Sequence, residues 1–293
     1  MKIIGVPLSY VLDWLMSLFN DNFALAVLGF TVIVNLIMLP LSIKSQKSTV
    51  KQAKLRPKLE VLKQKYGDDR QKMATAQQEL YAKEGVSPAG GCLPLIVRLL
   101  FLMGVYEVIR KPLTYIFRYT VTNDALAKFG KEEIKVLDSI VKNADGITKY
   151  FNAEQIAEVK SRISSFDFLG INLTETPNFS WDFSNFKPIW WIPILAFAAA
   201  MLNSIVMLII NKKANPDQPN MAGMMLTMPI ISLIIAFGLP GAVGFYWICS
   251  SIVSGIIQAF VSLYYNPNRL MAADRLKTLS KRNEYEKTKK SRG

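Results

Sequence analysis

The sequence predicts an all-α protein that crosses a membrane several times, and three observations support this fold class. The chain has 293 residues, of which 51% are hydrophobic. The apolar residues gather in five runs, each near the roughly 20 residues that a helix needs to cross a bilayer. The formal charge is +13, with the basic residues concentrated between particular runs, which is typical of a membrane protein with one basic side.

The composition also excludes several kinds of site. The chain contains no histidine, which excludes Ser-His-Asp triads and histidine-based metal motifs. Cys92 and Cys249 both fall inside apolar runs, where cysteine is expected to be a small buried hydrophobe. We therefore predict no catalytic residue, no metal site and no cofactor, and we do not expect an enzyme.

Residues 1–22 are expected to form a helix at the membrane surface. Asp13 interrupts the apolar run and no small-residue cleavage site follows, so the segment does not read as a signal peptide. Apolar side chains between Val11 and Phe19, opposed by Asp13 and Asn20, favour an interfacial helix. An ordinary helical lead-in is an equally good interpretation.

The remaining chain alternates between spans and connections. The predicted spans are residues 23–43, 90–110, 190–210, 221–239 and 241–265. They leave four connecting or terminal segments, residues 44–89, 111–189, 211–220 and 266–293.

Charge predicts the orientation of these segments. Residues 44–86 hold eleven basic and five acidic side chains, and the tail 266–293 is also strongly basic, whereas residues 111–187 hold ten of each sign. The positive-inside rule therefore places 44–89, 211–220 and 266–293 in the cytoplasm. The N-terminus and the region 111–189 are expected outside.

The cytoplasmic segment 44–89 is expected to be a helical hairpin. Its arms are Gln46–Tyr66 and Arg70–Lys83, with an aspartate of the intervening turn as N-cap. An inert connector is the alternative, which the size of the segment makes less favourable. In the outer region we expect surface helices at Asp124–Val141 and Ala153–Ile163, followed by a loop-and-turn stretch at 168–177.

Polar residues inside the spans form the most informative pattern. They occupy the middle and cytoplasmic half of four spans, while the outer ends are mostly apolar. Several of them share one helical face at i, i+4 and i+7 spacing. The candidate residues are Thr31, Asn35, Arg98, Asn203, Ser204, Trp247, Ser251, Ser254 and Gln258.

Arg98 decides between two interpretations of this pattern. Ser, Thr, Asn and Gln alone are ordinary contacts between membrane helices. An arginine at membrane depth costs roughly 2.5–3.5 kcal/mol, and no span carries an acid at that depth. We therefore predict a hydrophilic groove, open to the cytoplasm and closed outside, with Arg98 as its fixed charge.

The residues resemble a known family at several places. The chain is similar to the YidC/Oxa/Alb membrane protein insertases, in their bacterial five-helix and clostridial-like form. The motifs that carry the resemblance are LPLSIK, YGDDRQK, LYAKEGVSPAGGCLPL, FLGINLTETP, MPIIS, LPGAVGFYW and IIQ. They extend over nearly all of the chain between Phe23 and Asn266, and the start of the chain lacks a lipoprotein-type cysteine motif.

The sequence departs from the family pattern at two groove positions. Members typically carry an arginine in the first span, where this chain has Asn35, and a glutamine in the second span, where it has Arg98. The usual proline two residues later is Leu100. Our hypothesis is that the positive charge has moved to the second span. If the charge must lie on the first span, the chain is a specialised paralogue.

The resemblance implies an insertase that is not an enzyme and needs no cofactor. The expected partners are nascent membrane proteins, the ribosome through the basic tail, and anionic lipids. The Sec translocon and the targeting machinery are further candidate partners. The chain is expected to act as a monomer in the bacterial cytoplasmic membrane. The resemblance assigns recruitment to the hairpin tip, which consists of Tyr66, Gly67, Asp68, Asp69 and Arg70. The rival functions are a secondary transporter of small anions and a lipid scramblase.

Overall fold

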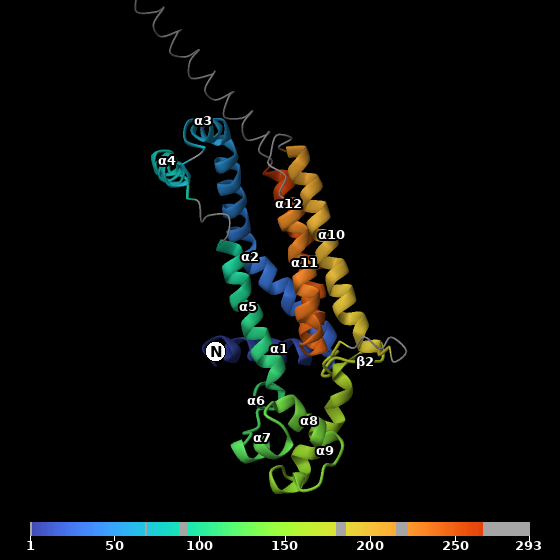
Figure 1. Cartoon of the computed structure of the whole chain (residues 1–293). Helices are drawn as coiled ribbons and strands as arrows, with labels where there is room; N and C mark the ends of the chain where they lie inside the picture. Colours follow the sequence, from blue (N-terminus) through green and yellow to red (C-terminus); the bar gives the residue numbers. More distant parts are fainter. Residues whose placement is uncertain (1, 68, 88–92, 180–185, 215–221, 266–293) are drawn as a thin grey trace, which may run out of the picture. The chain divides into compact units, whose positions relative to one another are not determined.

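The computed structural model describes residues 2–67, 69–87, 93–179, 186–214 and 222–265, and within these it is almost entirely helical (Figure 1). The longer helices are α1 (Lys2–Leu18), α2 (Phe23–Lys54), α3 (Arg56–Tyr66), α4 (Arg70–Lys83), α5 (Leu93–Arg110), α10 (Trp191–Ala214), α11 (Ala222–Phe237) and α12 (Gly241–Tyr264). Between α5 and α10 lie α6 (Pro112–Tyr115), α7 (Asn123–Phe129), α8 (Glu133–Val141), α9 (Ala153–Arg162), the 3-10 turns η2 (Ile147–Lys149), η3 (Ile163–Phe166) and η5 (Pro188–Trp190), and strands β1 (Asp167–Phe168) and β2 (Ile171–Asn172).

The chain divides into two compact units. The first consists of Met1–Ile37, Val97–Ile205 and Ala222–Gly255. The second consists of Met38–Ile96, Val206–Met221 and Ile256–Gly293. The first unit therefore holds the outer region and most of the apolar helices, and the second holds the hairpin.

Within the described residues, three helices are long and apolar enough to cross a membrane, by length and composition: Phe23–Lys54, Pro188–Ile210 and Gly241–Tyr264. The other two predicted spans correspond to α11, a shorter apolar helix, and to α5, whose 18 residues include Arg98, Glu107 and Arg110. The all-α polytopic fold class is confirmed. That the chain crosses the membrane five times stays a prediction. Several predicted features lie outside the described residues: Asp68, the start of the second predicted span with Cys92, residues 215–221 and the tail 266–293.

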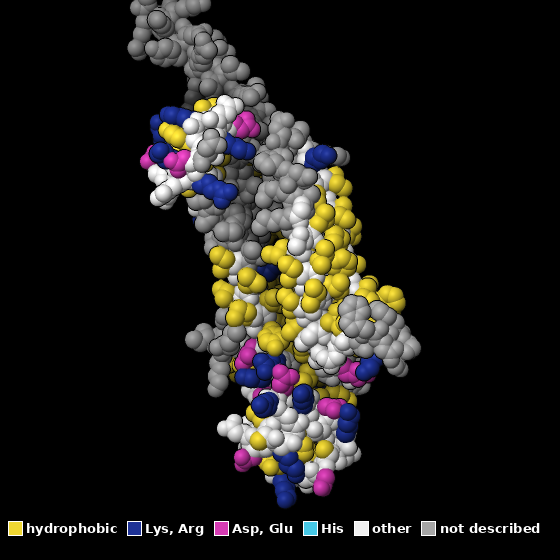
Figure 2. All heavy atoms as spheres, in the orientation of Figure 1, with side chains coloured by type: hydrophobic (Ala, Val, Ile, Leu, Met, Phe, Trp, Pro, Cys, Tyr) yellow, Lys and Arg dark blue, Asp and Glu magenta, His cyan; other side chains and the backbone are white. Residues whose placement is uncertain are grey.

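Apolar side chains cover the outside of the helices of the first unit. Figure 2 shows this for the visible faces of α10 and α11, where Leu202 and Ile234 are 64% and 72% exposed. An apolar surface of this extent on helices of membrane-spanning composition is expected to face lipid. In the same unit, charged side chains of both signs gather over α6–α9, as expected for a region in water.

Two predicted helix boundaries are wrong. The arm predicted at Gln46–Tyr66 begins only at Arg56, because α2 continues unbroken to Lys54 and Pro57 lies in the first turn of α3, where proline is favoured. The helix predicted at Asp124–Val141 is two helices, because Gly130, with φ +135°, ends α7. The helix α9 agrees with the prediction and begins with a capping box of Asn152 and Gln155.

Helix α1 has two different faces. Within the first unit it lies crosswise to α5 and α11 (Figure 1), with Leu15 and Met16 buried. Its opposite face carries an exposed apolar stripe of Val6, Tyr10, Trp14 and Leu18, 43–60% exposed. Arg118 holds the helix, because its guanidinium lies 4.1 Å from the Tyr10 ring centre and 3.4 Å from Asp13. These faces are those of an interfacial helix, and its position in a membrane stays a prediction.

The stretch after β2 joins the ends of two apolar helices. The amides of Gly241 and Ala242 at the start of α12 donate to the carbonyls of Glu175 and Leu173, both at 2.7 Å. The amide of Asn178 donates to the Phe237 carbonyl at the end of α11 (3.0 Å). Helix ends leave such groups without partners, so this stretch, a loop-and-turn in the sequence, satisfies both ends of the α11–α12 connection.

Replacing Gly241 is expected to destabilise this junction. A Cβ there would lie 2.6 Å from Ile189 Cδ1 and 3.3 Å from the Leu173 carbonyl oxygen, so Gly241→Val should lower the free energy of unfolding by about 1–3 kcal/mol. Thermal unfolding of the purified protein in detergent measures this. Gly223→Ala is the matched control, since no atom lies within 4 Å of that Cβ. Equal unfolding temperatures for the two variants would contradict the close approach.

A buried carboxylate joins α6 and α8. Glu133 on α8 is 6% exposed and accepts hydrogen bonds from the Thr114 amide (2.9 Å) and hydroxyl (2.6 Å). Burial raises the pKa of Glu133, while the Thr114 hydrogen bonds and Lys111 oppose that shift. The folded state therefore binds the Glu133 proton more tightly than the unfolded chain does.

This raised pKa predicts a pH-dependent stability. Between the ordinary glutamate pKa and the raised folded one, the folded state binds more protons, so the Glu133 contribution to stability falls as pH rises. The unfolding free energy of Glu133→Gln minus that of the native chain should therefore be larger at about pH 7 than at about pH 5. Thermal unfolding at both pH values measures it, with Glu132→Gln, at a partly exposed neighbour, as control. A difference that does not change with pH would contradict the assignment.

Candidate functional site

Arg98 lies on the first unit's part of α5, about 8 Å from the start of that helix at 1.5 Å per residue. Its side chain is accessible to solvent. Many protein atoms nevertheless surround it. Among the ion pairs of the described residues, none includes Arg98. Glu107, on the same helix, pairs with Lys111 at 2.8 Å. An accessible but enclosed cation without an acid is suited to an anionic partner.

Thr31 and Asn35 lie one turn apart on the buried face of α2, at 0% and 7% exposure. The Thr31 hydroxyl donates to the Val27 carbonyl at 2.7 Å, and the Asn35 side-chain amide donates to the Thr31 carbonyl at 2.8 Å. Both donors are therefore satisfied within their own helix. Among the described residues, neither side chain forms a hydrogen bond with Arg98, and the structure places Thr31 and Asn35 next to each other on one helix.

Helix α12 contributes the largest polar set of the first unit. Trp247 and Ser251 are half-buried, and Ser254 is 4% exposed with its hydroxyl 3.5 Å from the Ser251 carbonyl. Sequence reasoning missed two neighbours on this helix, Tyr246 and Ser250, which are 3% and 8% exposed. The i, i+4 spacing of these two was a usable signal, but the motif around Tyr246 read as an apolar run.

Helix α10 approaches α12 closely at a polar residue. The half-buried Asn203 lies against Gly255, where a Cβ would come within 2.9 Å of its Oδ1. This buried oxygen has no hydrogen-bond partner among the described residues. Ser204, the next residue, is half-buried. Glycine at 255 therefore lets a polar side chain lie between two apolar helices, where polar contacts hold membrane helices together.

Gln258 belongs to the second unit and has its own partners there. Its side-chain amide donates to the Ser262 hydroxyl at 3.3 Å and lies 3.4 Å from Gln46 Oε1. In the same unit, Lys47 lies 4.9 Å from the Tyr265 ring centre. The prediction that Gln258 shares a groove with the other candidate residues is left as a prediction.

The hairpin of the second unit is fastened at its base. Lys58 forms a short ion pair with Glu84, across the two arms. The Gln52 side-chain amide donates to the Ser87 carbonyl at 3.1 Å, which ties the end of the hairpin to α2. Because Leu55, at the α2–α3 break, is also buried, both ends of the hairpin are held close to one helix.

The hairpin tip is polar and hollowed. Asp69 is the N-cap of α4, since it accepts a hydrogen bond from the Lys72 amide at 3.0 Å, as the turn predicted. An open pocket of about 450 Å³ lies here, lined by Tyr66, Asp69, Gln71, Lys72, Thr75, Ala76 and Glu79. Of the other predicted tip residues, Gly67 and Arg70 are exposed. The tip thus carries charged and aromatic side chains around an open pocket.

These elements define an α-helical membrane protein that carries polar and charged side chains within its apolar helices. The family model described as "60Kd inner membrane protein" matches residues 14–268. The chain belongs to this family.

Three relatives illustrate the similarity. A "Membrane protein insertase YidC" of Fusobacterium nucleatum is 26% identical over 82% of this chain and 86% of its own length. A "Membrane protein insertase YidC 2" of Listeria innocua is 25% identical over 89% of this chain and 69% of its own length. A "Membrane protein insertase YidC" of Roseobacter denitrificans is 43% identical, over 35% of this chain and 17% of its own length.

Proposed function

We propose that this chain is a membrane protein insertase of the bacterial cytoplasmic membrane, which helps nascent membrane proteins to enter the bilayer. The observation that carries the proposal is the family match over residues 14–268, with insertases among the relatives that it matches over most of their length. Arg98, accessible and unpaired among the described residues, supplies the chemistry. Insertion makes and breaks no covalent bond, so we propose no enzymatic activity.

The proposed orientation follows charge. The basic segment 44–89 and the basic tail 266–293 lie in the cytoplasm, and the N-terminus lies outside. The region α6–α9, with charges of both signs, then faces the outer medium. The apolar stripe of α1 would lie in the outer interface, where Tyr and Trp side chains are favoured.

The mechanism depends on the cost of polar groups in hydrocarbon. A substrate helix with a short hydrophilic outer tail must bring that tail through the bilayer, and each unsatisfied backbone group costs several kcal/mol there. In our proposal, a water-accessible groove on the cytoplasmic side passes Arg98 and the half-buried Asn203 and Ser251, and the buried Thr31, Asn35 and Ser254 lie behind these residues. The tail stays hydrated through part of the membrane, so the remaining apolar path is shorter.

Arg98 would give this groove a preference for acidic tails. A guanidinium accepts carboxylates in charge-assisted hydrogen bonds. The membrane potential, positive outside, pulls the same tails outward with roughly 2.3 kcal/mol per charge per 100 mV. The apolar part of the substrate would meanwhile slide along lipid-facing surfaces of α5 and α12, where Leu99 and Ile252 are exposed.

We further propose how partners reach the groove. The hairpin tip recruits nascent chains or their targeting machinery, and the basic tail contacts ribosomal RNA or anionic lipid. The chain would act as a monomer, alone or beside the Sec translocon. A transporter of small anions or a lipid scramblase would also use a polar groove, but neither accounts for the hairpin or for the named relatives.

Neutralising Arg98 is expected to lower insertion. In cells depleted of their own insertase, Arg98→Gln should reduce insertion of a single-span test protein with an acidic outer tail on the order of tenfold, or about 1.4 kcal/mol. Arg98→Gln combined with Asn35→Arg should restore part of the loss, if the groove needs a cation on either helix. Protease accessibility of the outer tail measures insertion.

Arg110→Gln is the matched control, because it removes an arginine of the same helix that pairs with Glu132 at 3.1 Å and should leave insertion unchanged. Full insertion activity of Arg98→Gln would contradict the proposed role of the Arg98 charge. No insertion by the native chain would count against the proposed function itself.

The hairpin tip gives a separate prediction. Tyr66→Ala with Arg70→Ala removes an aromatic lining residue and an exposed cation at the tip, so crosslinking of nascent chains to the hairpin and their insertion should fall severalfold. Gln78→Ala, an exposed position of α4 away from the pocket, is the control. Unchanged crosslinking at equal protein levels would refute recruitment by the tip.

A further inference from the structure

The turn between β1 and β2 carries the most exposed large apolar side chain among the described residues. Leu169 is 86% exposed. The strand register pairs Phe168 with Ile171, which leaves Leu169 and Gly170 as a two-residue turn. A Cβ on Gly170 would have no described atom within 4 Å, so the turn projects away from the rest of the described structure.

The backbone of this turn does not favour a leucine. The angle φ is +52° at Leu169 and +76° at Gly170. Two-residue hairpin turns with positive φ at both positions strongly prefer the pair Asn-Gly, because asparagine tolerates a positive φ that is costly for a bulky side chain. The chain therefore places an exposed apolar residue where a polar residue would cost less. Such a combination of strain and exposure indicates a function for the side chain.

The turn lies beside the start of an apolar helix. The ring centres of Phe168 and Phe245 are 4.7 Å apart, and the Ala242 amide donates to the Leu173 carbonyl at 2.7 Å. Phe245 lies four residues into α12, or about 6 Å at roughly 1.5 Å per residue. This helix of 24 residues is about 36 Å long, against roughly 30 Å of hydrocarbon in a bilayer. Phe245, and with it the turn, therefore lies near the edge of the hydrocarbon.

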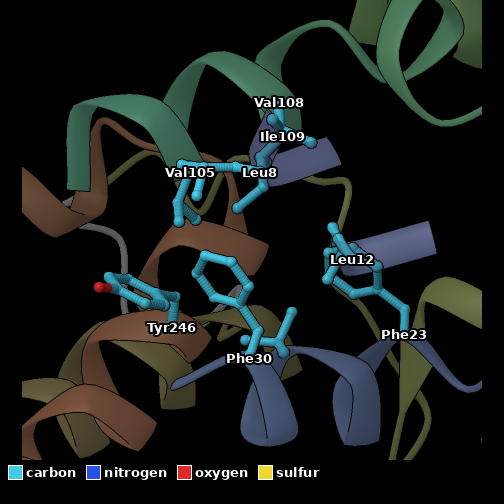
Figure 3. A pocket seen from close by; sticks show the side chains of 9 residues that line it. Leu8, Leu12, Phe23, Phe30, Val105, Val108, Ile109 and Tyr246 are labelled. Carbon is cyan, nitrogen blue, oxygen red and sulfur yellow. The ribbon is translucent and has the colours of Figure 1, made fainter. Parts of the chain in front are cut away.

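Helix α1 marks the same level in the first unit. Leu8 and Leu12 of α1 line a small apolar cavity together with Phe23, the first residue of α2 (Figure 3). The ring centre of Phe166, the residue before β1, lies 4.8 Å from that of Phe23. The turn is therefore held at the same end of the apolar helices as α1, whose exposed stripe is that of an interfacial helix.

Partly exposed aromatic side chains gather at the nearby ends of α10 and α11. Phe186 and Trp191 are 44% and 50% exposed, and their ring centres are 5.7 Å apart. Phe179, 45% exposed, lies 5.1 Å from Phe237 at the end of α11. Tryptophan is enriched where membrane helices cross the interface. This end of the unit thus has the composition of a membrane boundary, and the apolar faces of α10 and α11 begin there (Figure 2).

We propose that the β1–β2 turn is a membrane anchor, in which Leu169 inserts its side chain among the acyl chains of the lipids around the start of α12. Transfer of a leucine side chain from water to hydrocarbon is favourable, and this transfer offsets the cost of the positive φ. The anchor rests on the membrane-spanning fold and does not depend on the proposed insertase function. It holds the region α6–α9, which precedes β1 in the chain, at the bilayer surface.

Fluorescence quenching in nanodiscs measures where residue 169 lies. In a chain with Cys92→Ser and Cys249→Ser, Leu169→Cys is labelled with bimane. Lipids with a nitroxide near the start of the acyl chain should quench this label severalfold more than a label at Ala157→Cys, an exposed position of α9. Iodide in the buffer should show the reverse order. Ile234→Cys, 72% exposed on α11, is the reference for a lipid-facing position.

Nanodiscs expose both membrane faces to iodide, so the result does not depend on the orientation of the chain. Two outcomes would overturn the anchor. A Leu169→Cys label that iodide quenches as strongly as the Ala157→Cys label lies in water. A label that neither quencher reaches is covered by protein, such as a second copy of the chain.

The backbone gives a second test that needs no label. Leu169→Asn relieves the cost of the positive φ and removes the apolar side chain. In a turn that faces water, this change would raise the unfolding temperature in nanodiscs, whereas insertion into lipid predicts a fall on the order of 2 °C. Leu169→Met keeps an apolar side chain and should leave the unfolding temperature unchanged. An unchanged or raised temperature for Leu169→Asn would contradict the anchor.

Discussion

A cation carried on an apolar helix must be kept away from hydrocarbon, and much of this molecule follows from that constraint. Among the described residues, no carboxylate forms an ion pair with Arg98, and Glu107 and Glu132 pair instead with Lys111 and Arg110. Neutralisation by a partner molecule and hydration are the remaining ways to stabilise it. In the same unit, Ser250 and Ser254 of α12 are buried, and an apolar cavity of about 10 Å³ lies beside Phe30 and Tyr246.

Much of the fold could be predicted from composition and spacing alone. Apolar runs of about 20 residues allow few alternatives to a membrane-spanning helix. The aspartate in the turn before α4 predicted the N-cap that the structure has at Asp69. The misplaced boundaries had local causes. Nothing in Gln46–Lys54 breaks a helix, so α2 continues through this stretch, and the break at Leu55 precedes Pro57 in the first turn of α3. Gly130 was likewise passed over, although its positive φ ends α7.

The site was less accessible to sequence reasoning, because polarity identifies residue types and not their partners. Thr31 and Asn35 were found by spacing, but their hydrogen bonds within α2 depend on backbone geometry. Tyr246 and Ser250 were missed because they lie within a run of apolar residues, and their burial is visible only in the structure. Asn203 packs against Gly255 of another helix. The residue pattern of one helix does not predict a close approach to a glycine of another.

The stretch from Leu173 to Asn178 has a consequence for the order of assembly. It is synthesised before α11 and α12, and it supplies the carbonyls and the amide that the ends of those helices need. When the last helix leaves the ribosome, the carbonyls that accept its first hydrogen bonds have already been synthesised. The last two helices can therefore pack as a pair onto a stretch that is already present. The chain that we propose to assist other membrane proteins thus supplies, from its own earlier residues, the hydrogen-bond partners that its final helices need.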